Sequence, residues 1–141
     1  LYDPGISVVV DARIALQAGR VTAMHDPTEG GLAAALWELA AACGHTLVFD
    51  PQAVPVTPVS QKICQVFNID PLATIASGAL LLTTPVGHGP AICRALQDGG
   101  IPCVDIGAVV AGPPEVLRST EEGLLPLPCP ERDEIARVLE G

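Results

Sequence analysis

The stretch Met24–Leu32 reads Met-His-Asp-Pro-Thr-Glu-Gly-Gly-Leu. Of all segments of the chain, it has the residue types and spacing that most clearly indicate a binding or catalytic site. It joins an apolar, strand-like run to a helical pattern, so it predicts a polar turn at a helix N-terminus. The first four backbone N–H groups of a helix lack partners within the helix, and the helix dipole favours negative charge there. Asp26, Thr28, Gly30 and Gly31 therefore form a candidate site for a phosphate or another anion.

Simpler interpretations fit the same turn. Asp26 and Thr28 are residue types that commonly cap a helix by accepting hydrogen bonds from its first N–H groups. Gly30 and Gly31 could serve only to let another segment pack closely. His25 and Asp26 could form an acid–base pair, but adjacent strand residues point to opposite faces, which argues against it.

The composition bounds the class of protein. The 141 residues suit one domain, and because 49% are hydrophobic but only 3% aromatic, we expect an aliphatic core. The net charge of −9 argues against nucleic acid and anionic membranes as partners, since both require clustered cations. No apolar run approaches the roughly 20 residues of a membrane span, and no signal peptide is visible. We therefore expect a cytoplasmic protein.

Five cysteines, an odd number, are spread along the chain without a C-x-x-C spacing: Cys43, Cys64, Cys93, Cys103 and Cys129. This spacing argues against a zinc ribbon or a redox pair. Cys43, Cys64 and Cys93 fall in apolar-periodic segments, which favours small buried side chains in a reducing compartment. Cys129 lies between two prolines and is predicted to be exposed.

Helical and strand-like segments alternate, an order typical of a sheet with helices packed against it. Apolar residues three and four apart predict helices over 6–18, 31–43, 59–67, 89–97 and 130–139. We expect a central sheet of at least four strands, 21–24, 46–49, 79–84 and 103–110, with 79–84 covered on both faces. A further strand is expected over 115–119. In the first helix, Ile6, Val9, Val10 and Ile14 are predicted to face the core.

Several motifs together make the chain similar to the C-terminal domain of the aminoimidazole ribonucleotide (AIR) synthase superfamily. Within it, the chain most resembles the AIR synthase related proteins and the hydrogenase expression/formation proteins of the HypE type. The order and spacing of the motifs hold over about residues 5–112. They are the glycine turn in 23–33, Glu38 and Ala40, Val54-Pro55-Val56, Cys64, Asn68-Ile69-Asp70-Pro71-Leu72, Ser77-Gly78 and Ile106-Gly107.

The resemblance implies an α/β (α+β) sandwich with a mixed central sheet, formed by residues 1–141 as the second domain of a longer protein. In the family, an N-terminal domain, which the resemblance implies is missing from these residues, builds a homodimer and binds ATP and Mg²⁺. The C-terminal domain closes the nucleotide cleft with the turn Asp26-Pro27-Thr28-Glu29-Gly30-Gly31. By resemblance, Asp26, Thr28, Gly30 and Gly31 lie near the phosphates. We assign no metal ligand and no catalytic residue within the chain.

The implied activity is that of an ATP-dependent synthase or dehydratase that phosphorylates an amide- or carbonyl-type oxygen, with the isolated chain inactive. Three features depart from the HypE pattern. Glu29 replaces an arginine, Ala76-Ser77-Gly78 lacks a carboxylate, and Cys129 stands twelve residues before the end instead of at it. These departures favour a related ATP-dependent activity, with a non-catalytic regulatory or dimerisation module as the alternative. A purine-pathway synthase proper is a weaker third interpretation.

A domain that normally meets another domain exposes the surface of contact when that partner is missing. We therefore expect an apolar patch near the turn and the helix over 31–43, through which the chain self-associates.

Overall fold

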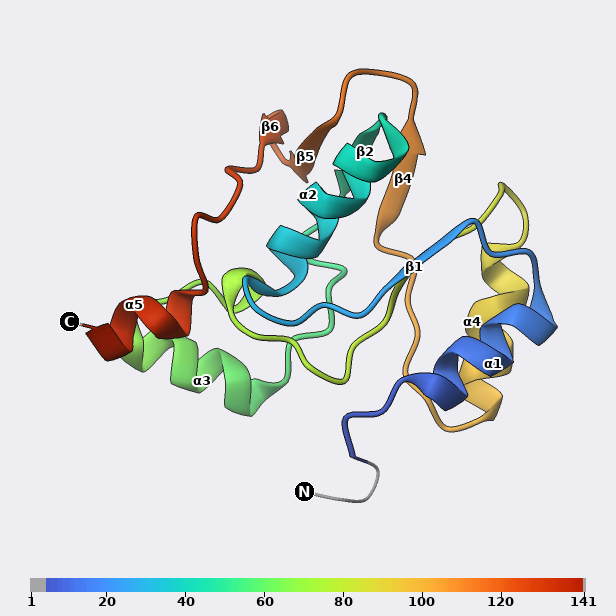
Figure 1. Cartoon of the computed structure of the whole chain (residues 1–141), viewed down its shortest axis with the longest axis horizontal. Coiled ribbons are helices and arrows are strands. Elements are labelled where there is room, and N and C mark those ends of the chain that lie inside the picture. Colours follow the sequence, from blue (N-terminus) through green and yellow to red (C-terminus); the bar gives the residue numbers. More distant parts are fainter. Residues whose placement is uncertain (1–4, 141) are drawn as a thin grey trace.

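The computed structural model describes residues 5–140, in which helices and strands alternate along the chain (Figure 1). In chain order the elements are α1 (Val9–Ala18), β1 (Ala23–His25), α2 (Gly31–Cys43), β2 (Thr46–Phe49), α3 (Pro58–Phe67), the 3₁₀ helix η1 (Pro71–Ala73), β3 (Leu81–Thr83), α4 (Gly89–Asp98), β4 (Gly107–Val110), β5 (Glu115–Thr120), β6 (Gly123–Pro126) and α5 (Glu134–Glu140). Each helix in this part of the chain is too short or too polar to traverse a bilayer.

The larger sheet has the strand order β4-β2-β5-β6. Its strand β2 runs antiparallel to β4 and parallel to β5, so Thr46 pairs with Val110 on one side and with Glu115 on the other. Helix α2 lies over this sheet (Figure 1), because small and aliphatic side chains on one side of the helix pack against the strands. The buried cluster that they form includes Ala33, Ala35, Leu36, Leu39, Ala40, Leu47, Phe49 and Val116.

The smaller sheet consists of β1 and β3 in antiparallel pairing. Helices α1 and α4 lie side by side next to it (Figure 1) and contain a second buried cluster, Ala15, Ile92 and Leu96. Met24 and Leu82 pack against this second cluster, whereas Ala23 and Leu81 pack in the cluster under α2. Because side chains alternate along a strand, this ladder joins the two clusters and fixes the position of the turn that follows β1.

The mixed α/β class is confirmed, but the strands are distributed differently from the prediction. Segments 21–24 and 79–84 do not join 46–49 and 103–110 in one sheet; they contribute β1 and β3 to a sheet of their own. In β3, Leu81 is buried and Leu82 and Thr83 are partly buried, so the two faces are covered to different extents. The apolar run over 79–84 is explained by its place between two clusters, which needs apolar side chains in both directions. Strand β6 was not predicted at all.

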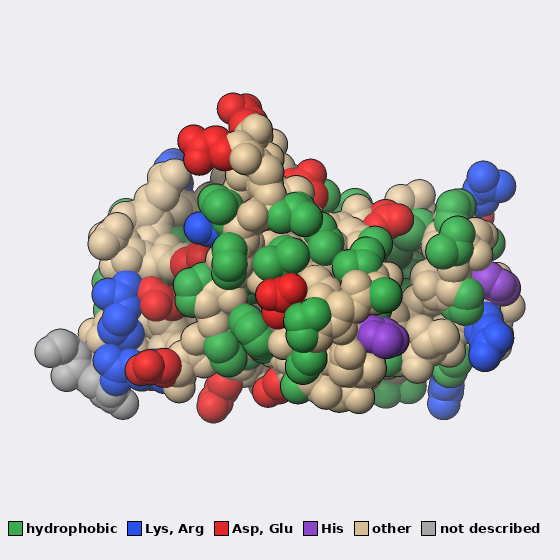
Figure 2. Space-filling view, turned by 90° about the horizontal axis from the view of Figure 1, so that it is seen from above, with side chains coloured by type: hydrophobic (Ala, Val, Ile, Leu, Met, Phe, Trp, Pro, Cys, Tyr) green, Lys and Arg blue, Asp and Glu red, His purple; other side chains and the backbone are tan. Residues whose placement is uncertain are grey.

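Large apolar side chains remain exposed on several elements. Val9 and Val10 are 54% and 58% exposed, so the prediction that α1 buries them is wrong; Ala15 is its buried residue. Other exposed positions lie on α3, β4 and β6 and include Val59, Ile63, Val66, Phe67, Val109, Val110, Leu124 and Leu125. None of the large exposed apolar residues lies on α2 itself, whereas Ile75, which precedes the Ala76 that is bonded to the turn, is exposed. Figure 2 shows hydrophobic side chains gathered over the middle of one face, with Lys and Arg mostly toward its two ends.

Candidate functional site

The turn at residues 26–30 connects β1 to α2 and has a buried backbone with exposed polar side chains. Pro27 is fully buried, and Gly30 and Gly31 are buried as well. Asp26 and Thr28 are exposed. Pro27 and the two glycines therefore pack the turn against the interior, while the side chains of Asp26 and Thr28 face solvent.

Both glycines of the turn are required by the backbone. Gly30 and Gly31 have φ angles of 72° and 59°, in the left-handed region that favours glycine. A Cβ atom on Gly31 would lie 2.2 Å from the carbonyl oxygen of Thr74 and 2.7 Å from that of Leu72. The interpretation that glycine permits close packing of another segment is thus confirmed for Gly31, since the segment that includes η1 passes directly over it, whereas a Cβ on Gly30 would meet Ala34 of α2.

Thr28 fastens the turn through its backbone. Its carbonyl oxygen accepts hydrogen bonds from the N–H groups of Gly31, at 3.0 Å, and of Ala76, at 3.2 Å. The segment Ala76-Ser77-Gly78, singled out from the sequence, is therefore attached directly to the turn. The Gly31 N–H is used in this bond, and the Gly30 N–H donates to a different residue.

The N-terminus of α2 has Gly30 as its N-cap and no side-chain cap. The interpretation of Asp26 and Thr28 as helix caps is therefore wrong. A left-handed glycine occupies the cap position, and neither side chain forms a hydrogen bond within the described part of the chain.

A carboxylate from the C-terminal segment reaches the turn instead. The Gly30 N–H donates to Oδ2 of Asp133 at 2.8 Å, while Oδ1 of Asp133 accepts from the N–H of Ile135 at the start of α5. The same segment is tied to the end of α3, because the Arg137 guanidinium donates to the Asn68 carbonyl oxygen at 2.8 Å. The contact of Asp133 with the turn was not predicted, because Asp133 lies 103 residues from Gly30 and its position before α5 indicates only a helix cap.

Nε2 of His25, at the end of β1, is hydrogen-bonded to the Glu38 carboxylate on α2. The side chains of His25 and Glu38 are 28% and 65% exposed. The structure thus gives His25 a different carboxylate from the neighbouring Asp26 that the acid–base hypothesis invoked. This contact links the strand before the turn to the helix after it.

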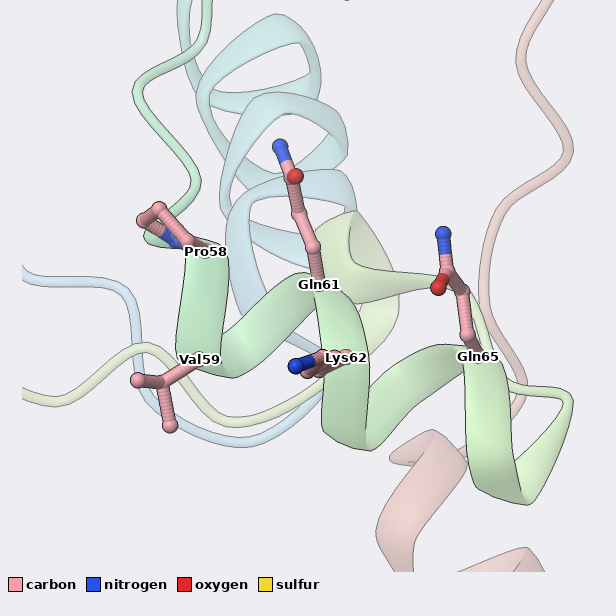
Figure 3. A pocket seen from close by; sticks show the side chains of 5 residues that line it. All are labelled: Pro58, Val59, Gln61, Lys62 and Gln65. Atoms are coloured by element: carbon pink, nitrogen blue, oxygen red, sulfur yellow. The ribbon is translucent and has the colours of Figure 1, made fainter.

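Two shallow hollows lie elsewhere on the surface. One of about 250 Å³ is lined along α3 by Pro58, Val59, Gln61, Lys62 and Gln65, and Figure 3 shows Gln61 and Gln65 projecting from the same side of the helix. The other, of about 380 Å³, lies beside β2 and β4, where its lining includes Asp50, Asp105, Ile106 and Ser119. Neither hollow includes a residue of the turn.

Among the described cysteines, two lie close together. Sγ of Cys93, on α4, is 3.2 Å from Sγ of Cys103, and both residues are half-buried and unbridged. Burial, the hydrogen bond and charge of Cys93, and the charge of Asp105 raise the pKa of the Cys103 thiol to about 12. Cys64 is buried and Cys129 exposed, as predicted, but the expectation that Cys43 is buried is wrong.

With all cysteines kept reduced, we expect the free energy of unfolding to fall as the pH rises from about 9 towards 12. In this window the folded state retains the Cys103 proton and the unfolded state loses it, so folding binds more protons and higher pH favours unfolding. Denaturant titrations at stepped pH should show a smaller decline for Cys103→Ala than for the unaltered protein. Equal declines would contradict the raised pKa.

The site and the fold together define a class: a mixed α/β domain with a glycine turn at the start of a buried helix. Residues 7–119 match the family described as AIR synthase related protein, C-terminal domain. The match covers most of the chain and includes the turn, so the chain belongs to this family.

Relatives with assigned names fall within the hydrogenase-maturation group. The chain is 33% identical over 103 residues to carbamoyl dehydratase HypE of Rhodobacter capsulatus, a match that covers 71% of the chain and 30% of the relative. It is 31% identical over 70 residues to a putative hydrogenase expression/formation protein of Methanocaldococcus jannaschii, covering 50% and 21%. The matched part of the chain therefore spans less than a third of the length of these relatives.

Solved structures agree with this grouping. The crystal structure of Escherichia coli HypE, a hydrogenase maturation protein, superposes with a TM-score of 0.82 at 25% identity, covering 93% of this chain and 42% of that one. A crystal structure of HypE in complex with ATP superposes with a TM-score of 0.77 at 26% identity, covering 86% and 39%. These structural similarities support the mixed α/β fold described above for the chain, which includes the turn.

Proposed function

We propose that this chain is the C-terminal domain of an ATP-dependent protein of the hydrogenase-maturation type. In this proposal the turn Asp26-Pro27-Thr28-Glu29-Gly30-Gly31 closes one side of the nucleotide cleft. The observation that carries the proposal is the overlap of 86% of the chain with a HypE structure that holds ATP. The exposed side chains of Asp26 and Thr28 supply the polar groups of the turn.

The donor at the turn suits a negatively charged oxygen. The Gly30 N–H already binds an oxygen of the Asp133 carboxylate at 2.8 Å, so a phosphate oxygen fits the same donor once Asp133 is displaced. The exposed Thr28 hydroxyl can donate a second hydrogen bond to phosphate. Asp26 is an acceptor only and would repel phosphate directly, so its role requires Mg²⁺ between the two.

The rest of the proposed protein lies outside the chain. An N-terminal domain would supply the other wall of the cleft, most of the ATP and Mg²⁺ contacts and the homodimer interface. The complete protein would act in the cytoplasm. Gly31 would not bind phosphate through its N–H, which is bonded within the turn. Its role is steric, because the absence of a side chain leaves room for the backbone that crosses it.

The isolated chain should bind ATP with a Kd above about 1 mM, because only one wall of the cleft is present. Calorimetry with ATP and Mg²⁺ measures this directly, with the full-length protein as the positive control. A micromolar Kd for the isolated chain would contradict the proposal, since it corresponds to about 8 kcal/mol from half a site.

A non-catalytic regulatory or dimerisation module is the second candidate, and one observation favours it. Two carboxylates, those of Glu29 and Asp133, bring negative charge to the turn where a phosphate would bind. ATP binding to the full-length protein separates the two functions. Binding that is lost in Thr28→Ala supports the nucleotide cleft, and the absence of binding supports the module.

A further inference from the structure

Cys93 and Cys103 are brought together by the way the chain leaves α4. After Asp98, two glycines reverse the chain, with Gly100 at a φ of 77°. The Ile101 N–H then donates to the carbonyl oxygen of Leu96 at 2.9 Å, and the Gln97 side chain donates to that of Cys103 at 2.9 Å. The returning segment therefore lies along the helix.

Packing holds the two thiols in this arrangement. Cys103 and Ile101 pack against the buried cluster of Ala15, Ile92 and Leu96, which is formed by α1 and α4. Cys93 lies one residue from Ile92 on the same helix. Packing against this buried cluster therefore holds the segment that carries Cys103 next to α4, and with it the contact between the two sulfur atoms.

We propose that Cys93 and Cys103 are a reversible modification site, at which a small-molecule disulfide such as glutathione disulfide oxidises them to an intrachain disulfide. Their sulfur atoms are 3.2 Å apart and need to approach by about 1.2 Å to reach disulfide length. Both residues are half-buried and so remain partly accessible. Among residues 5–140, no group of three or more His, Cys, Asp or Glu side chains that could hold a metal ion occurs.

The reaction proceeds in two exchanges. The Cys93 thiolate attacks the small disulfide, forms a mixed disulfide and releases one small thiolate. The Cys103 thiol then loses its proton and its sulfur displaces the second small thiolate, which closes the intrachain bond. The two protein thiols lose two electrons and two protons, and the small disulfide becomes two thiols. The first attack is assigned to Cys93 because burial and neighbouring groups raise the pKa of the Cys103 thiol, which disfavours the Cys103 thiolate.

The cross-link would restrain the segment that leads into β4. This segment carries Asp105 and Ile106, which line the hollow of about 380 Å³ beside β2. Asp105 accepts a hydrogen bond from the Gly107 N–H, and the Ile106 carbonyl oxygen accepts one from the Asp50 N–H. Oxidation would therefore stiffen one wall of that hollow and the start of an edge strand.

The test incubates the full-length protein with defined ratios of reduced and oxidised glutathione. We expect a loss of two free thiols, a decrease of about 2 Da in intact mass, and a peptide that links Cys93 to Cys103, all reversed by dithiothreitol. Cys93→Ala and Cys103→Ala should each abolish this link. Cys43→Ala and Cys129→Ala, which remove exposed thiols, should leave it unchanged.

A second measurement does not depend on variants. Amide hydrogen exchange over residues 99–106 should slow by about tenfold on oxidation and recover on reduction, because the disulfide suppresses local opening of this segment. The proposal is overturned if glutathione disulfide gives only glutathione adducts at these cysteines, if the linked peptide joins other cysteines, or if both thiols stay free at a fully oxidising ratio.

Discussion

Replacing Asp26 by alanine in the full-length protein should lower ATP turnover by about a hundredfold and leave stability almost unchanged. Loss of an aligned electrostatic contact in a closed site commonly has a cost of this size. The Asp26 side chain is exposed and caps no helix, so its removal should change the free energy of unfolding by no more than about 0.5 kcal/mol. Turnover is measured beside the thermal midpoint of the same preparation.

Two companion variants make this result specific. Thr28→Ala removes the neighbouring hydroxyl and should also slow turnover, whereas Glu121→Ala removes an exposed carboxylate outside the turn and should change neither quantity. If Asp26→Ala and Thr28→Ala both keep near-normal turnover, the turn has no role in nucleotide chemistry and its assignment is wrong.

The helical part of the fold could be predicted because its signals are local. The spacing of Leu32, Ala35, Leu36 and Leu39 predicts α2, whose first and last residues, Gly31 and Cys43, are both as predicted. The burial of α1 could not be predicted in the same way. Its apolar residues at 9 and 10 fit a buried face, but α1 meets the core through Ala15 and, as predicted, through Ile14, which packs against the same cluster. Which side of a helix finds a partner is decided by tertiary packing.

The sheets show a second limit. Apolar runs identify Thr46–Phe49 and Leu81–Thr83 as strands, but they do not say which strands become neighbours. Pairing depends on contacts across the chain, such as Ala23 with Thr83 and Thr46 with Glu115. One sheet and two sheets are therefore equally compatible with the local pattern.

The candidate turn was located by its residue types, but its contacts were not. The partner of the Gly30 N–H is Asp133, and His25 pairs with Glu38. The contact of Cys93 with Cys103 likewise joins residues whose spacing matches no familiar motif. Such contacts arise when the chain returns to the same place in space, so a local pattern carries no signal for them.

Replacing Gly31 by alanine should destabilise the fold by about 3 kcal/mol more than replacing Gly44 by alanine. Both glycines lie in the left-handed region, with φ angles of 59° and 68°, so both substitutions carry the same backbone cost of about 1–2 kcal/mol. A Cβ on Gly44 meets no atom within 4 Å, whereas one on Gly31 meets the Thr74 carbonyl oxygen at 2.2 Å. Denaturant unfolding of the two variants isolates the added cost, since overpacking against backbone forces a shift. Equal losses of stability would show that the crossing backbone yields easily, and close packing would then no longer explain why glycine stands at position 31.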